Sequence, residues 1–571
     1  MQWRERVLDP QLASQWSGQA VHPLMARLWA LRGVSTPSAM DTDLKHMLPP
    51  LMLKGMAQAA ADLAQALCDR ARLMIVADYD CDGATACAVG MRGLKALGAH
   101  NVQAVVPDRA RDGYGLTPEI AQRVKALGAD WLITVDNGIA SVEGVAHARA
   151  LGLRVLITDH HLPGDTLPEA DHLINPNQPG CPYPSKHLSG VGVMFNLLVA
   201  TRAVLRESGQ WPSAMAASAR LDPLLPLVAL GTVADLVRLD EHNRRLVHQG
   251  LARIRQGIMP AGLKALFEVS GRPYSDASAS DLGFSLGPRI NAAGRLSDMR
   301  MGIECLTQDD PVQARALAEQ LDAINRQRRD LQADMSESAL ALVQPTLTGA
   351  PPPAVCVFHP DFHEGVVGIV AARLKEAWHR PSFVFAANAN EPQQLRGSGR
   401  SIAGFHLRDA LDLVAKRHPG LLIRFGGHAM AAGCTIQRSG LDDFARALAD
   451  IAQQTLCAED LEQQLLHDGS LPAEWLNLHT AQHLRDQVWG QGFAEPVFCD
   501  PVRVREQRIV GDKHLRLQVT LHGQPLNAIW FGRTDPLPED CHIAYALDLN
   551  TWQGQTRLQL RVLDAQSLAH G

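Results

Sequence analysis

Residues 73–83 read LMIVADYDCDG, a short apolar run that passes directly into three carboxylates and a glycine. The apolar run is typical of a buried strand, and the acidic residues Asp78, Asp80 and Asp82 stand at alternate positions just after it. Carboxylates this close repel each other, and a bound cation is the usual compensation. The stretch therefore predicts a strand whose end delivers ligands to a metal ion.

An EF-hand loop is the main alternative for this D-x-D-x-D-G run. Counted from Asp78, such a loop requires a bidentate Glu at its twelfth position, where this chain has Val89. The run also follows a strand pattern, whereas an EF-hand loop follows a helix. A solvated acidic turn is a second alternative, and a catalytic metal site is the interpretation that we favour.

Further possible metal ligands follow two other apolar runs, and one more lies within an apolar stretch. Asp136 follows the run 131–135, and Asp159, His160 and His161 follow the run 155–158. Asp235 lies in an apolar, helix-like stretch, where a lone carboxylate is costly unless it is paired or metal-bound. Each signal alone is weak, since Asp often occupies turns. Together, carboxylates and imidazoles suit Mn²⁺, or Mg²⁺ with retained waters, better than structural zinc.

Apolar strand-like runs alternate with Ala- and Leu-rich helical stretches from about residue 50 to residue 175. This alternation is typical of an α/β fold with a mostly parallel sheet, in which ligands bind outside the carboxyl ends of the strands. The expected strands are 73–76, 102–106, 131–135, 155–158 and 173–174, and the expected helices are 84–97, 118–127 and 141–151.

The rest of the chain divides at a long helix. Residues 311–344 contain no glycine and no proline after Pro311, which predicts a connecting helix of roughly 50 Å at 1.5 Å per residue. A Gly/Pro break at 349–353 precedes a second α/β segment, 354–455. Short strand-like runs between 493 and 571 predict a small β-barrel of the OB type. The expected barrel strands are 502–504, 515–521, 527–531 and 557–562.

Composition limits the class of protein. The 571 residues are 46% hydrophobic and 20% charged, as in ordinary globular proteins of several domains. The net charge of −6 provides no general attraction for nucleic acid, so a polyanion would be held by metals and local arginines. Ten cysteines occur without a C-x-x-C pair, which fits a reducing cytoplasm. No secretory signal and no membrane span are indicated.

The acidic and histidine motifs, taken in order, resemble the DHH phosphoesterase superfamily. A longer match is similar to its single-strand-specific 5′→3′ exonucleases and covers residues 50 to about 571. The segments that carry this longer match are 106–109, 113–116, 189–193, 287–295, 363–370 and 426–428. The resemblance implies a DHH domain, a long connecting helix, a DHHA1-like α/β domain and an OB-like β-barrel.

The resemblance implies a centre with two Mn²⁺ or Mg²⁺ ions, in which Asp136 bridges the metals. Asp78 and Asp159 would orient the ligands, and His161 would face the scissile phosphate. Hydrolysis of a phosphodiester would proceed without a covalent intermediate. The expected metal ligands are Asp80, Asp82, Asp136, His160 and Asp235.

Candidate substrate-binding residues lie next to the glycine-rich motifs or in the matching segments. Guanidinium groups and backbone amides at such places can meet phosphates, although each arginine could equally form a surface ion pair. The expected substrate-binding residues are Arg109, Tyr114, Arg289, Asn291, Arg295, Arg373, Arg400, Gly427 and His428.

The expected function is an exonuclease that releases 5′-mononucleotides from the 5′ end of single-stranded DNA in repair and recombination. The resemblance also implies a single-strand-binding protein and a helicase as partners. We expect the protein to be a cytoplasmic monomer that does not associate with a membrane. The 5′→3′ direction of digestion rests on the resemblance alone. The rivals are a DHH phosphoesterase for short oligonucleotides or cyclic dinucleotides, a non-catalytic DNA-binding scaffold, and a pyrophosphatase. The expected domains are an N-terminal segment 1–50, DHH 51–305, helix 306–345, DHHA1-like 350–455 and OB-like 460–571.

Overall fold

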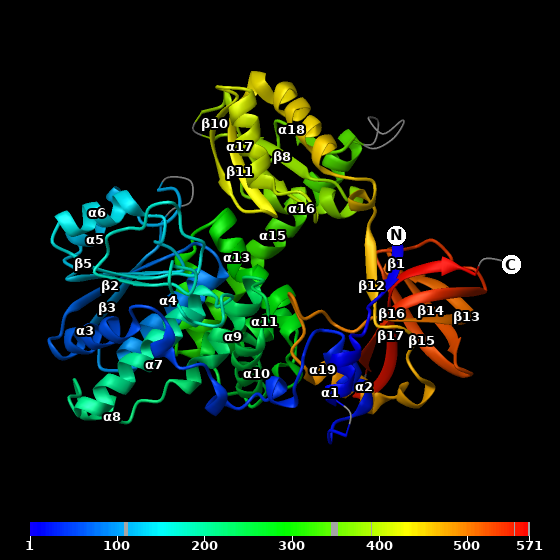
Figure 1. Cartoon of the computed structure of the whole chain (residues 1–571), viewed down its shortest axis with the longest axis horizontal. Helices are drawn as coiled ribbons and strands as arrows, with labels where there is room; N and C mark the ends of the chain where they lie inside the picture. The colour runs from blue at the N-terminus through cyan, green and yellow to red at the C-terminus, as the bar shows by residue number, and fades with distance from the viewer. Residues whose placement is uncertain (17, 108–111, 344–351, 390, 553, 569–571) are drawn as a thin grey trace. The chain divides into compact units, whose positions relative to one another are not determined.

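A computed structural model describes residues 1–16, 18–107, 112–343, 352–389, 391–552 and 554–568. The chain forms two compact units (Figure 1). One comprises Met1–Arg4 and Ala323–Leu465, and the other comprises Glu5–Asp322 and Leu466–Gly571. The larger unit holds the acidic motifs and the C-terminal barrel.

The larger unit contains a five-stranded sheet in the order β3-β2-β4-β5-β6, with every neighbouring pair parallel. This confirms the predicted α/β fold. The strand order reverses direction between β2 and β4, which is where open parallel sheets bind ligands. The strands are β2 Arg72–Ala77, β3 Asn101–Val105, β4 Trp131–Val135, β5 Arg154–Thr158 and β6 His172–Ile174.

Helices cover both faces of this sheet (Figure 1). Helices α5 and α6 pack on one face through Ile120, Val124 and Val145, and α3, α4 and α7 build the core on the other. The helices are α3 Met56–Cys68, α4 Cys81–Ala96, α5 Pro118–Ala126, α6 Val142–Ala150, α7 Gly190–Ser208, α9 Leu225–Ala234, α10 Glu241–Arg255 and α11 Ala261–Ser270.

The glycine-containing segment that leads to the long helix is helical. Residues 282–286 form a π-helical turn, η6, and Gly287–Leu296 form helix α13, so Arg289 and Arg295 are helical. Helix α14 spans Arg300–Thr307. Helix α15 spans Pro311–Val343, which confirms the long helix as far as the described residues extend.

The smaller unit has a sheet in the order β10-β11-β9-β8-β7, in which only β7 and β8 are parallel. Its glycine-rich motifs lie in strands rather than in turns, because Gly397 and Gly399 leave room for the rings of Phe385 and Phe383 on β8. The elements are β7 Val355–Phe358, α16 Val367–Trp378, β8 Ser382–Ala387, β9 Gln394–Arg400, α17 Leu407–Arg417, β10 Leu422–Gly427, β11 Ala431–Gln437 and α18 Leu441–Thr455.

The C-terminal strands close into a five-stranded barrel in the order β13-β14-β15-β17-β16, which confirms the predicted OB-like barrel. Strand β16 was missing from the sequence prediction, and in the structure its residues 543–547 are all buried. The strands are β13 Phe498–Val510, β14 His514–Leu521, β15 Gln524–Phe531, β16 Asp540–Trp552 and β17 Gln555–Ser567.

The N-terminal segment packs against the barrel side of the larger unit. Arg32 forms a buried ion pair with Asp468, with Nη1 at 2.9 Å from Oδ1. Helices α1, α2 and α19 span Pro10–Trp16, Pro23–Ala30 and Leu478–Asp486. Among the described residues, no helix has the length and apolar character needed to span a membrane.

Candidate active site

The predicted ligands converge at the carboxyl edge of the parallel sheet. Asp78 and Asp80 follow β2, and Asp80 caps helix α4 by accepting a hydrogen bond from the Gly83 N–H. Asp136 follows β4, which is the neighbour of β2 at the point where the strand order reverses. Asp235 caps the C-terminus of α9. The sheet topology, together with helix α9, thus brings residues that are far apart in the sequence to one place.

His160 lies among three carboxylates. Its Nε2 atom is 3.0 Å from Asp136 Oδ1, 3.4 Å from Asp235 Oδ2 and 3.9 Å from Asp82 Oδ2. An imidazole nitrogen and carboxylate oxygens at these separations can share a divalent cation of the Mn²⁺ or Mg²⁺ type.

Three overlapping groups of side chains offer ligand atoms that lie within 4.8 Å of one another. Asp136 belongs to two of them and His160 to two, so neighbouring cation positions would share these residues. This arrangement brings together every predicted metal ligand and also Asp78 and His161. The groups are Asp136, His160 and His161; Asp82, His160 and Asp235; and Asp78, Asp80 and Asp136.

Asp136 carries the clearest sign that a cation belongs in the cluster. Its Oδ1 atom is buried and, although His160 Nε2 lies 3.0 Å away, accepts no hydrogen bond from the described residues. Its backbone has φ +62°, a left-handed conformation that is uncommon outside glycine and typical of constrained functional sites. Burial, and then the charges of Asp82 and Asp80, raise the pKa of Asp136 well above its usual range. A bound cation would relieve the repulsion between these carboxylates, so the residues fit a divalent metal.

Asp82 is held by the first turn of helix α7. The N–H groups of Gly190 and Val191 donate hydrogen bonds of 2.6 and 3.0 Å to its two carboxylate oxygens. Burial and the charge of Asp80 nevertheless raise the pKa of Asp82 to about 7. Burial likewise raises the pKa of Asp78 and Asp235 well above the usual carboxyl range, with repulsion from nearby carboxylates adding to it.

His161 is oriented by Asp159. Its Nδ1 atom lies 2.8 Å from Asp159 Oδ1. Although burial opposes protonation, the hydrogen bond to Asp159 and the surrounding carboxylates raise the pKa of His161 to about 9. Tyr114 Oη lies 3.3 Å from His161 Nε2 and so borders the same site. A positively charged imidazole here can face an anionic substrate.

Several supporting residues escaped the sequence analysis. Asn175 and Asn177 donate hydrogen bonds to the backbone oxygens of His161 and His160, at 2.9 and 2.6 Å, and so fix the tandem histidines. Asn137 bridges the ends of β2 and β4 by donating to the oxygens of Val76 and Val135, at 3.0 and 2.9 Å. The signal available in the sequence was an asparagine that comes directly or almost directly after an apolar, strand-like run.

The predicted substrate residues of the larger unit fall into different settings. Arg109 lies outside the described residues. Asn291 accepts a 2.8 Å hydrogen bond from the Cys81 N–H and thereby supports the acidic loop. Arg295 lies in the last turn of α13. The role of each in binding substrate remains a prediction.

Arg289 is buried against the long helix rather than exposed beside a turn. Its Nε and Nη2 atoms each lie 2.9 Å from Asp322 Oδ1, and Nη1 donates to the backbone oxygen of Ser285 in η6. These contacts make Arg289 a brace between α13, η6 and α15.

The other four predicted substrate residues belong to the smaller unit. Arg373 lies on α16 and pairs with Glu376 at 3.2 Å. Arg400, at the end of β9, donates to Ser398 Oγ and to the backbone oxygen of Gly399. Gly427 has φ +135°, and a Cβ there would lie 2.5 Å from the Ala431 oxygen, which accepts a hydrogen bond from the His428 N–H. The β10–β11 turn therefore requires glycine at this position.

Comparison with known proteins places the chain in a family. Family models match the DHH family, N-terminal domain, at residues 72–232, the DHHA1 domain at 352–454 and the RecJ OB domain at 467–564. A protein of Dickeya dadantii named single-stranded-DNA-specific exonuclease RecJ is 46% identical over 552 residues, which span 94% of this chain and 95% of that protein. The chain belongs to the RecJ family.

Two solved RecJ structures from Thermus thermophilus share the fold. The complex with Mn²⁺ is 30% identical, with a TM-score of 0.81, and the match covers 99% of this chain and 80% of that one. The complex with Mg²⁺ is 28% identical, with a TM-score of 0.76, over 99% of this chain and 78% of that one. Membership of the RecJ family confirms the resemblance drawn from the acidic and histidine motifs.

Proposed function

We propose that this chain is a metal-dependent exonuclease specific for single-stranded DNA, which releases 5′-mononucleotides from the 5′ end. The observation that carries the proposal is the cluster of carboxylates around His160, with Asp136 shared between neighbouring ligand groups. The names of the RecJ relatives support the activity and the substrate. The 5′ polarity and the mononucleotide product follow from family membership.

Two Mn²⁺ or Mg²⁺ ions would, when bound, neutralise charge on the scissile phosphate and lower the pKa of an attacking water. The ligands for them would be Asp80, Asp82, Asp136, His160 and Asp235. Asp78 would support the acidic loop, since its Oδ1 accepts a hydrogen bond from the Tyr79 N–H.

The remaining residues act on the substrate without a covalent intermediate. Asp159 holds His161 in a fixed orientation and raises its pKa, so that an imidazolium would face the scissile phosphate. Tyr114 limits the space next to His161. Arg109, Arg295, Arg373, Arg400 and His428 would hold phosphates further along the strand.

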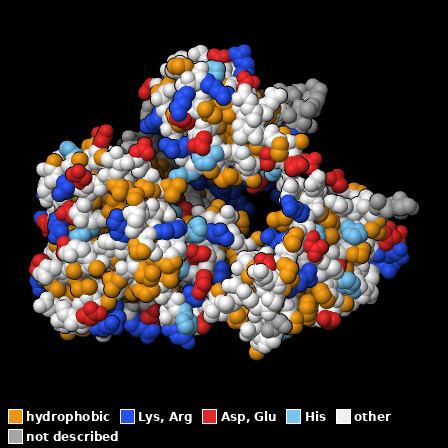
Figure 2. Space-filling view, in the orientation of Figure 1, with side chains coloured by type: hydrophobic (Ala, Val, Ile, Leu, Met, Phe, Trp, Pro, Cys, Tyr) orange, Lys and Arg blue, Asp and Glu red, His pale blue; other side chains and the backbone are white. Residues whose placement is uncertain are grey.

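The charge distribution fits local rather than global attraction of DNA. The net charge is −6, and on the face shown in Figure 2 basic side chains are interspersed with acidic ones. Affinity for a polyanion would thus come from metals and from individual arginines.

The cellular setting is part of the same proposal. All ten cysteines are free thiols, as expected in a reducing cytoplasm. We propose that the protein acts there as a monomer in DNA repair and recombination, with a single-strand-binding protein and a helicase as partners.

Digestion of a single-stranded oligonucleotide labelled at either end tests this function. With Mn²⁺ or Mg²⁺, the 5′ label should appear early as a mononucleotide, while a matching duplex and an EDTA control remain intact. Cleavage of only di- to tetranucleotides would instead indicate an oligonucleotide phosphoesterase. DNA binding without cleavage would indicate a scaffold, and release of orthophosphate from pyrophosphate would indicate a pyrophosphatase.

A further inference from the structure

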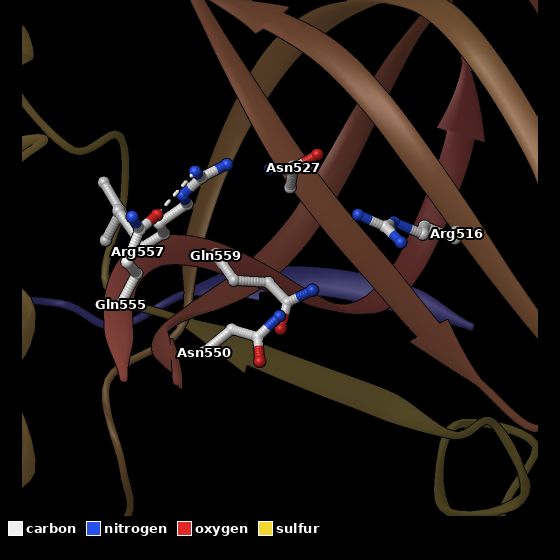
Figure 3. A pocket seen from close by; sticks show the side chains of 7 residues that line it. Arg516, Asn527, Asn550, Gln555, Arg557 and Gln559 are labelled. Atoms are coloured by element: carbon white, nitrogen blue, oxygen red, sulfur yellow. Dashed lines mark hydrogen bonds between the residues drawn. The ribbon is translucent and has the colours of Figure 1, made fainter. Parts of the chain in front are cut away.

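A polar pocket opens on the C-terminal barrel (Figure 3), and none of its lining residues belongs to the carboxylate cluster. Its volume is about 410 Å³, within the usual range for a small-molecule site. Strands β14, β15, β16 and β17 each contribute a polar side chain to its lining: Arg516, Asn527, Asn550 and Gln559.

The barrel register places these side chains next to one another on its outer surface. Asn527 on β15 pairs with Gln559 on the parallel strand β17, and Asn550 on β16 pairs with Arg557 on β17. The alternate residues of β14, such as Leu515 and Leu517, point into the barrel core instead. In Figure 3 the amide ends of Asn550 and Gln559 lie close together at the pocket.

Four of the polar side chains that line the pocket are not used by the protein itself. Within the part of the chain that the structure describes, the side chains of Arg516, Asn527, Asn550 and Gln559 make no hydrogen bond or ion pair. The two remaining polar lining residues hold each other, since Arg557 donates a 2.9 Å hydrogen bond to Gln555 Oε1. Amides that meet no protein partner while they line one hollow are available for a ligand with its own donors and acceptors.

The lining also defines what kind of ligand fits. Its described residues include two arginines and no carboxylate. They also include four side chains that end in an amide, which are Asn527, Asn550, Gln555 and Gln559. They include no aromatic ring either, so these residues do not offer stacking, the common source of affinity for single strands on OB barrels. Recognition there would depend on hydrogen bonds to the edge of a base and on charge.

We propose that this pocket binds one nucleotide of a single strand through the edge of its base and selects purines over pyrimidines. Arginine pairs with guanine O6 and N7, and asparagine or glutamine pairs with adenine N6 and N7. A carboxylate, the typical acceptor for cytosine N4, is absent from the described lining residues. This proposal rests on the proposed function, because single-stranded DNA is the polymer that the enzyme would hold.

Binding of the full chain to 20-residue oligo(dT) strands in EDTA provides the test. A single dA, dG, dC or abasic unit is placed at successive positions, and affinity is measured by fluorescence anisotropy. At one register, dA or dG should tighten binding by about fivefold or more relative to dC. The double variant Asn527→Ala/Gln559→Ala should lose this preference.

Gln518→Ala is the matched control, because Gln518 is an exposed amide on β14 opposite Asn527 that does not line the pocket. It should keep the purine preference. Gln559→Glu guards against a fold defect, since the new carboxylate should redirect the preference towards dC. Equal affinity for all four bases and the abasic unit at every position would overturn the proposal, as would loss of the preference in Gln518→Ala alone.

Two further arms separate the possible sources of the ligand and the two proposals. If free dAMP competes with the strand at equal concentration, the pocket binds the product rather than the polymer, and the proposal fails. Parental cleavage of all-dT strands with Mn²⁺ is measured in parallel. If the parent cleaves these strands but its binding shows no base preference, only the pocket proposal is overturned. If the parent does not cleave them, the proposed function is overturned.

Discussion

The Gly190 N–H donates a 2.6 Å hydrogen bond to Asp82 Oδ2, although the two residues are 108 positions apart in the chain. The bond ties the acidic loop after β2 to the first turn of α7. The positive end of the helix dipole and two backbone N–H groups thus face one carboxylate of the metal cluster. The closeness of α7 to the cluster also explains why a glycine stands at residue 190.

Gly190→Ala should disrupt the cluster. A Cβ at residue 190 would lie 2.5 Å from Asp136 Cβ and 2.6 Å from Asp136 Oδ1, so Asp136 would have to move. We expect a loss of about 10- to 100-fold in Mn²⁺ affinity or in kcat/KM, which is the range for changes that misplace metal ligands. Gly192→Ala is the control, because its Cβ would approach Leu188 Cδ2 at 3.1 Å, a contact that a side chain can relieve. Equal losses in both variants would contradict the argument.

Metal binding should depend on pH. Asp82 has a pKa of about 7 in the metal-free protein, so it keeps its proton below that pH and must lose it to bind a cation. The affinity for Mn²⁺ should therefore fall by about tenfold per pH unit for each proton displaced below pH 7. Calorimetry in buffers of different ionisation enthalpy measures the released protons, and a pH-independent affinity would argue against this charge arrangement.

The same pKa has an opposite effect on the metal-free fold. The pKa of Asp82 is raised from 3.8 to about 7 on folding, so its contribution to stability is present below pH 4 and is lost as the pH rises to 7. The contribution of Asp82 should therefore lower the melting temperature of the EDTA-treated protein as the pH rises from 4 to 7. Added Mn²⁺ should raise the melting temperature most near pH 8. A Mn²⁺ stabilisation that is larger at pH 5 than at pH 8 would be the wrong sign.

Arg289→Met should destabilise the fold rather than weaken DNA binding selectively. Removing the guanidinium would leave Asp322 buried without its 2.9 Å partner, which typically costs about 3–5 kcal/mol. The double variant Arg289→Met/Asp322→Leu should recover most of that loss, because an apolar pair can replace a buried ion pair. Urea denaturation measures both. If Arg289→Met keeps its stability but loses affinity for DNA, Arg289 contacts the substrate directly.

Much of the fold was predictable because its signals are local. The apolar runs of β2, β4 and β5 are followed directly by Asp78, Asp136 and Asp159, so strand ends and ligands were visible together. A parallel sheet places such ends on one edge, and this general rule was enough to bring Asp78, Asp136 and Asp159 together. Asp235 lies at the end of helix α9, so its place in the cluster depended on the family resemblance. The long helix was equally visible from its lack of glycine and proline.

Features that depend on distant partners were not predictable. The role of Gly190 requires the approach of α7 to Asp136, and the burial of Arg289 requires Asp322 on another helix. Their sequence neighbourhoods carry no sign of either contact. Strand β16 was missed because alanines alternate with the larger apolar residues in it, so its apolar run resembles a helical stretch as much as a strand. The domain boundaries and the roles of the individual site residues remain predictions.

Counting bound Mn²⁺ in the parent and in Asp136→Ala, while following digestion of a 5′-labelled single strand, tests the central claim most directly. Asp136 is shared by two ligand groups. We predict two ions per parental chain, at most one in the variant, and loss of hydrolysis with only a small loss of DNA binding. A variant that still binds two ions and cleaves at a near-normal rate would contradict the assignment of this centre.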